Sequence, residues 1–155
     1  MRYPASRNAA GCRRCQAGHV NLRCLLVDDN RPFLAAAQAL LETQGMVVVA
    51  AVSTTAEARR QANRLRPDVA LVDIGLGTES GFDLARDLAG QARPTPVILI
   101  STRDEDEYTD LIAASPAIGF VPKARLSARA VEHLLTRMTS RPDSLPAPAR
   151  SAALG

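Results

Sequence analysis

Five short apolar runs, each followed by a segment with helical periodicity, constrain the fold of this chain more than any other feature. The runs are residues 22–27, 46–52, 69–72, 97–100 and 117–121. Runs of four to seven residues suit strands and are too short to span a membrane. Because most of them are continuous rather than alternating, both faces of each strand should be covered. The pattern therefore predicts an α/β fold, a doubly wound sheet of five parallel strands flanked by five helices.

The segments between the runs carry helix start and stop signals. Asn30 is a favourable N-cap with Pro32 in the first turn after it, and Gly45 is a typical helix end. Another helix is expected to begin at about Ser80. Two capping boxes are expected, Thr54 with Glu57 and Thr102 with Glu105.

The charge is distributed unevenly and divides the chain into three parts. Residues 1–21 carry +4, residues 22–139 carry −2 and residues 140–155 carry +1, for a net charge of +3. We expect a flexible basic head (1–21), one folded domain (22–139) and a flexible Pro-rich tail (140–155). A nucleic-acid surface would need clustered Lys and Arg on the fold itself, so direct nucleic-acid binding is not expected.

The three cysteines are not expected to form a disulfide framework, because the count is odd and the first residues lack the apolar core of a secretory signal. Cys12, Cys15, His19 and Cys24 could together bind zinc. A disordered, arginine-rich head is the favoured alternative, since Cys24 falls within a predicted buried strand. Without a signal or a spanning segment, we expect a cytoplasmic protein that does not enter the membrane.

Polar residues follow four of the five predicted strands at the point where each strand ends. Asp28 and Asp29 follow the first strand, Asp73 the third, Ser101 the fourth and Lys123 the fifth. In doubly wound sheets, binding sites lie outside these carboxyl ends. Three carboxylates brought together repel one another unless a cation is present, and oxygen ligands of this kind suit Mg²⁺.

Taken singly, each of these residues has an ordinary structural explanation. Asp29 and Ser101 could be helix N-caps, Lys123 a solvated surface residue and Phe120 a core residue. Their convergence at one edge of the sheet favours a functional site.

The motifs resemble, closely and in order, the receiver domain of bacterial two-component response regulators. They are LLVDDN (25–30), PDVALVDIGL (67–76) with Gly81 eight residues beyond Asp73, PVILIST (96–102) and GFVPK (119–123). The resemblance covers about residues 22–139 and implies a flavodoxin-like sheet of order 2-1-3-4-5. The last motif is similar to receivers of the subclass that usually carries a C-terminal helix-turn-helix.

The resemblance also implies a role for each residue at the strand ends. Asp73 would accept a phosphoryl group from the phosphohistidine of a cognate histidine kinase. Mg²⁺ would be held by Asp28, Asp29, Asp73 and the backbone carbonyl of Gly75. Ser101 would donate a hydrogen bond to the phosphoryl group, Lys123 would pair with it, and Ser101 and Phe120 would form the conformational switch. Such a domain is not an enzyme for other substrates, because it catalyses only its own phosphorylation and dephosphorylation.

One departure from the family concerns the loop after Asp73. Receivers often have proline where Gly77 stands, so this loop is expected to be more mobile here.

The expected output is a phosphorylation-dependent protein contact. Only 16 residues follow Thr139 and they are Pro-rich, whereas a helix-turn-helix needs its own helices and core. The contact, with another protein or a second copy of the chain, is expected on the face of the fourth helix, fifth strand and fifth helix, around Tyr108, Lys123 and Arg129.

Three alternatives remain open. The chain could be the receiver part of a DNA-binding regulator whose effector domain is absent from it, or a receiver that folds without being phosphorylated. It could also be a Mg-dependent enzyme, a toprim-type nuclease or a haloacid-dehalogenase phosphatase. The phosphatase would place a second aspartate where Gly75 stands.

Overall fold

The computed structural model describes residues 21–103 and 105–140. Nearly all of the predicted head and tail, with Cys12, Cys15 and His19, lies outside these described residues. The described elements are β1 (Arg23–Val27), α3 (Arg31–Thr43), β2 (Val47–Val52), α4 (Thr55–Leu65), β3 (Val69–Asp73), β4 (Gly75–Leu76), β5 (Glu79–Ser80), α5 (Gly81–Ala89), β6 (Val97–Ser101), α6 (Thr109–Ala114), β7 (Gly119–Pro122) and α7 (Ala128–Ser140). Short 3₁₀ helices occupy Glu105–Tyr108 and Lys123–Arg125.

The main sheet has five parallel strands in the order β2-β1-β3-β6-β7, which confirms the predicted doubly wound topology. The chain runs outward in one direction from β1 to β2, then returns to β3 and continues the other way. This reversal of strand order lies between β1 and β3, where a doubly wound sheet has its binding crevice. The short strands β4 and β5 form a separate antiparallel hairpin.

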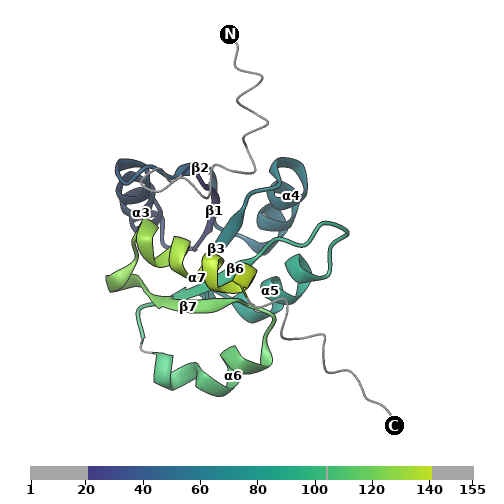
Figure 1. The fold of residues 1–155 in the computed structure, drawn as a ribbon. Coiled ribbons are helices and arrows are strands. Elements are labelled where there is room, and N and C mark those ends of the chain that lie inside the picture. The colour runs from purple at the N-terminus through teal and green to yellow at the C-terminus, as the bar shows by residue number, and fades with distance from the viewer. Residues whose placement is uncertain (1–20, 104, 141–155) are drawn as a thin grey trace.

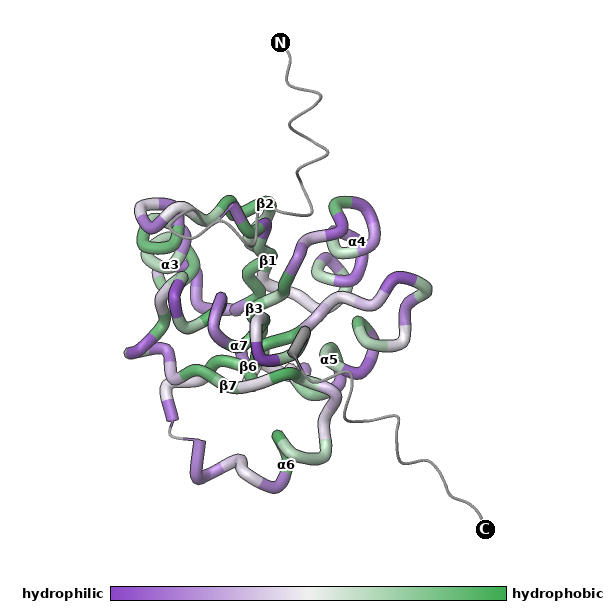
Figure 2. The backbone as a smooth tube through the Cα atoms, in the orientation of Figure 1, coloured by the Kyte–Doolittle hydropathy of each residue, from purple (hydrophilic) through white to green (hydrophobic). Residues whose placement is uncertain are grey.

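The sheet is covered on both faces, as the continuous apolar strands predict. Along β1, Cys24 and Leu26 pack into a core shared with α3 and α7, whereas Leu25 and Val27 pack into a core shared with α4 and α5. Figure 1 shows α3 and α7 on one side of the sheet and α4 and α5 on the other. Figure 2 shows that the central strands are the most hydrophobic part of the backbone. Among the described helices, none is long and apolar enough to cross a membrane.

The strand β2 is the least buried of the five strands in the main sheet. It lies at the edge, and most of its residues are exposed or half-buried although all six are apolar. Its register against β1 shifts between Cys24 and Leu25. An irregularity of this kind interrupts regular pairing along an edge strand, which is a common protection for exposed edges.

Most of the predicted helix ends are confirmed. Asn30 and Ser80 cap α3 and α5, since their side-chain oxygens accept hydrogen bonds from the first-turn amides of Phe33 and Phe82. The backbone amide of Glu57 donates to Thr54 Oγ1 at 3.2 Å, which is one half of the predicted capping box. Helix α3 ends at Thr43, and Gly45 follows with a positive φ of 99°.

The predicted capping box of Thr102 and Glu105 is wrong. The amide of Arg103 donates to Ser101 Oγ at 3.0 Å, so the chain turns immediately after β6. A 3₁₀ turn follows, and α6 begins only at Thr109, with Tyr108 as an N-cap that makes no side-chain hydrogen bond. The turn has no buried residue, although its last residue, Tyr108, packs against the ring of Phe82. Little apolar burial therefore supports an α-helix at that point.

Candidate functional site

The strand register brings the polar residues together at one edge of the sheet. Asp73 is the last residue of β3 and lies opposite Ile100 of β6, and Ser101 lies opposite Pro122, the last residue of β7. Asp28 and Asp29 directly follow β1. The carboxyl ends of the four strands therefore present these side chains to one crevice, as the sequence predicts.

The three aspartates form a compact cluster. Asp28, Asp29 and Asp73 each offer a carboxylate oxygen, and these oxygens lie within 4.8 Å of one another. Asp28 is 0% and Asp73 8% exposed, whereas Asp29 is open to solvent. Two of the like charges are thus largely withdrawn from water, an arrangement that needs a compensating cation.

Lys123 supplies part of that compensation. Its Nζ lies 2.5 Å from Asp28 Oδ2 and 3.4 Å from Asp73 Oδ2, and its side chain is only 10% exposed. The ammonium also lies over the ring of Phe33, 4.4 Å from the centroid. Such a contact is a cation–π interaction, which helps to hold the ammonium in place. Phe33 was not among the residues predicted for the site. Its position in the first turn of α3, four residues after Asp29, was the available signal.

The pKa of Asp73 reflects the balance of these influences. Burial raises it most, the charge of Asp28 raises it further, and Lys123 and the Gly75 backbone amide lower it, leaving a pKa of about 6. The carboxyl group is therefore largely ionised at neutral pH, but at a cost in stability.

The donor set fits a divalent cation that prefers oxygen. Asp28 Oδ1 accepts a hydrogen bond from the Asn30 amide at 2.8 Å, which fixes the carboxylate. The other oxygen, Oδ2, is buried, and among the described residues it makes the ion pair with Lys123 but no hydrogen bond of regular geometry. Such an oxygen has unused capacity to accept a further electropositive partner, and the ligands all suit Mg²⁺.

Ser101 and Phe120, the predicted switch residues, are both withdrawn from solvent at least in part. Ser101 is 5% exposed, and its hydroxyl is engaged by the Arg103 amide. Phe120 is half-buried and packs against the core on the α4 and α5 side. The prediction that Lys123 forms part of the partner surface is wrong. Its ammonium is directed into the acidic site instead.

The loop after Asp73 is the β4–β5 hairpin, where the sequence analysis expected a mobile loop. Gly77 lies in its turn with a φ of +67°, which proline cannot adopt. At the base of the hairpin, a Cβ atom on Gly81 would lie 2.2 Å from the Asp73 carbonyl oxygen. Only glycine allows the start of α5 to pack this closely against the end of β3.

Cys24 is unsuited to the zinc site considered above. It is 0% exposed within the core, and burial raises the pKa of its thiol far above the ordinary value. A zinc ligand must be a thiolate, so this environment works against metal binding.

Comparisons with known proteins agree with this geometry. The family model of the response regulator receiver domain matches residues 24–135. A protein-glutamate methylesterase/protein-glutamine glutaminase from Alkalilimnicola ehrlichii is 32% identical over 107 residues, covering 67% of this chain and 27% of that protein. The transcriptional regulatory protein KdpE of Mycobacterium tuberculosis is 38% identical over 81 residues, covering 52% of this chain and 35% of that protein.

Among solved structures, the signal receiver domain of a modulated diguanylate cyclase from Desulfovibrio desulfuricans G20 is similar, with a TM-score of 0.64 and 29% identity. The match covers 83% of this chain and all of that domain. The chain spans only 27% to 52% of the length of the curated relatives it matches. With the family model covering most of the chain and its fold reproduced, this chain belongs to the response regulator receiver domain family of two-component systems.

Proposed function

We propose that this receiver is phosphorylated on Asp73 by a histidine kinase in a Mg²⁺-dependent reaction. The observation that carries the proposal is the convergence at one crevice of three carboxylates, whose oxygens lie within 4.8 Å of one another, and the ammonium of Lys123. A receiver lacking phosphorylation would have no need to keep two buried carboxylates and a lysine together.

Asp73 is the nucleophile in this proposal. Its carboxylate attacks the phosphorus of a phosphohistidine, and the P–N bond breaks as the bond to the Asp73 oxygen forms. The raised pKa of about 6 still leaves the nucleophile mainly ionised at neutral pH. The Ser101 hydroxyl would donate a hydrogen bond to a phosphoryl oxygen, and its own oxygen accepts the Arg103 amide.

Lys123 would neutralise a second phosphoryl oxygen. Its ammonium already lies 3.4 Å from Asp73 Oδ2, within reach of a phosphoryl group attached to that carboxylate. Asp28, Asp29, Asp73 and the Gly75 carbonyl would hold Mg²⁺, which when bound would neutralise charge on the transferring phosphoryl group.

The proposed output is a contact on the face formed by α6, β7 and α7. A groove on this face is lined by Phe120, Pro122, Arg129 and Leu134, among others. Phe120 thus touches both the core and this groove. If Ser101 moves toward a phosphoryl group, Phe120 can rotate into the space it leaves and change the groove.

The relatives differ in the proteins that carry the receiver, which are described as a methylesterase, a transcriptional regulator and a diguanylate cyclase. We propose that the receiver domain of residues 22–139 signals through protein contact, cytoplasmically, with its kinase and with one output partner or a second copy. A haloacid-dehalogenase activity has no support, because Gly75 offers no acidic side chain at the required position.

The test is phosphorylation by acetyl phosphate with Mg²⁺, followed by intact-protein mass spectrometry. Wild type should gain one base-labile phosphoryl group, and Asp73→Asn should gain none because an amide does not attack phosphorus. Analytical ultracentrifugation with a phosphoryl mimic, beside a gel shift on duplex DNA, tests the output. A variant that remains fully labelled, or tight sequence-specific DNA binding, would refute the respective part of the proposal.

A further inference from the structure

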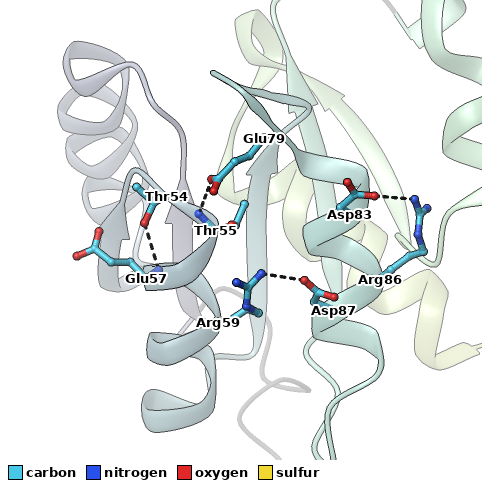
Figure 3. Close-up of polar contacts among 8 residues, drawn as sticks. All are labelled: Thr54, Thr55, Glu57, Arg59, Glu79, Asp83, Arg86 and Asp87. Carbon is cyan, nitrogen blue, oxygen red and sulfur yellow. Dashed lines mark hydrogen bonds and ion pairs between the residues drawn. The ribbon is translucent and has the colours of Figure 1, made fainter.

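The β4–β5 hairpin is attached to helix α4 by a residue that the receiver motifs do not account for. Glu79 lies in β5, and its Oε1 accepts a hydrogen bond from the backbone amide of Thr55 at 3.0 Å. Thr55 is the first residue of α4, so this amide is one that the helix itself cannot satisfy. Figure 3 shows the Glu79 side chain reaching from the hairpin to the start of α4.

Glu79 makes a contact at this helix start that the predicted capping box of Thr54 and Glu57 does not include. In a complete capping box, the Glu57 side chain would accept the backbone amide of Thr54. Instead its side chain points away from the hairpin, while its amide is capped by Thr54 (Figure 3). The amide of Thr55, the first of the helix, is thus bonded by Glu79, an acid 24 residues further along the chain. A carboxylate at a helix N-terminus is also favoured by the helix dipole.

The same hairpin forms one wall of the aspartate cluster. At its first residue, the Gly75 amide hydrogen-bonds to Asp73 and lowers the pKa of that carboxyl group. At its turn, a Cβ atom on Gly77 would lie 3.4 Å from Asp29 Oδ2. The two strands pair Gly75 with Ser80 and Leu76 with Glu79, so a displacement of Glu79 displaces the residues beside the cluster.

We infer that Glu79 is a positioning residue that fastens the hairpin to α4 and thereby couples metal binding at the aspartate cluster to the start of that helix. This inference rests on the proposed Mg²⁺ site. Coupling of this kind is reciprocal. If the fastened hairpin favours Mg²⁺, bound Mg²⁺ must strengthen the contact between Glu79 and Thr55 by the same factor.

The first measurement is Mg²⁺ affinity by isothermal titration calorimetry on the whole chain. Glu79→Ala should weaken binding about three- to tenfold, since one hydrogen bond at a helix start contributes about 1 kcal/mol. Glu79→Gln keeps an oxygen that can accept the Thr55 amide, so it should recover most of the affinity. Glu57→Ala removes an acid from the same helix turn without touching the hairpin, and its affinity should stay within about twofold of wild type.

The second measurement is hydrogen exchange of the Thr55 amide by NMR. Saturating Mg²⁺ should slow this exchange in wild type and in Glu57→Ala but not in Glu79→Ala. If Glu79→Ala raised the exchange rate relative to wild type by the same factor with and without Mg²⁺, the loss would be merely structural. That result would overturn the coupling.

The outcomes separate this inference from the proposed function. If wild type binds Mg²⁺ and Glu79→Ala binds it equally well, the inference is wrong and the phosphorylation site stands. If Glu79→Gln binds Mg²⁺ as weakly as Glu79→Ala, the hydrogen bond between Thr55 and Glu79 is not the cause of the lost affinity. If wild type binds no Mg²⁺, both the metal site and the coupling fail.

Discussion

Helices α5 and α6 each follow a strand that ends at the acidic site, yet the protein holds them very differently. Helix α5 has nine residues, is capped by Ser80 and buries five of its side chains or glycine positions. Helix α6 has six residues, no side-chain cap and no buried residue, and its Leu111 is 54% exposed. Figure 1 shows α6 set apart at the β7 edge of the sheet, while α5 lies against its face.

The difference indicates which side of the site can move. The β3 side is fixed by the core contacts of α5 and by the close approach of Gly81 to Asp73. The β6 side leads into a segment with few buried contacts, where local opening costs little free energy. A change at Asp73 should therefore displace α6 and its surroundings more than α5.

The largest effect should come from Gly81→Ala, which breaks the fixed side. The new Cβ would lie 2.2 Å from the Asp73 oxygen and 2.9 Å from the Ile74 Cα, and neither backbone atom can avoid it by changing rotamer. We expect a loss of more than about 3 kcal/mol in the free energy of unfolding, measured by urea denaturation. Gly75→Ala is the control, since nothing lies within 4 Å of its added Cβ. Equal losses in the two variants would contradict the packing argument.

A matched pair of leucines compares the two helices directly. Leu88 of α5 is 0% exposed, whereas Leu111 of α6 is 54% exposed. Leu88→Ala should cost about 2–5 kcal/mol of unfolding free energy because it opens a cavity in the core. Leu111→Ala should change it by less than about 0.5 kcal/mol. Comparable costs at the two positions would show that α6 is packed more firmly than its exposure indicates.

Ionisation of Asp73, at the end of β3, should lower the free energy of unfolding as the pH rises. The folded protein raises the pKa of this group from 3.8 to about 6, so its protonated form favours folding. That contribution is fully present below about pH 4 and is lost as the pH rises through 6. In EDTA, Asp73→Asn should be more stable than wild type by about 1–3 kcal/mol at pH 8, and by almost nothing at pH 4. Denaturation curves at both values check this, and a gain that is independent of pH would exclude the titration of Asp73 as its cause.

The smallest change in stability should come from the residues at the starts of α5 and α6. Ser80 Oγ accepts the Phe82 amide at 3.1 Å, so Ser80→Ala should cost about 1 kcal/mol. Thr102 does not cap α6, which has Tyr108 at its N-cap position, so Thr102→Ala should be near neutral. Thermal melts of the two variants give the comparison. A clear loss for Thr102→Ala would restore the capping role that the structure denies it.

The sequence by itself determined the order of strands and helices, the doubly wound topology and the edge at which the site lies. Continuous apolar runs require burial on both faces, and parallel strands place all their carboxyl ends together. Asp28, Asp29, Asp73, Ser101 and Lys123 could therefore be placed at one crevice without coordinates. Local hydrogen-bonding chemistry likewise identified the cap at Asn30 and the helix start near Ser80, because each cap's partner lies within three residues.

Only the tertiary structure decided the contacts that join distant segments. Lys123 lies closer to Asp28 than to Asp73, and its ammonium lies over Phe33. The Thr55 amide donates a hydrogen bond to Glu79. All of these contacts depend on how separate elements pack. The same holds for Thr102, whose capping pattern is present in the sequence but is not used. A local pattern states which hydrogen bonds are available. The choice among them depends on burial and on neighbouring acceptors, such as Ser101, whose hydroxyl accepts the Arg103 amide.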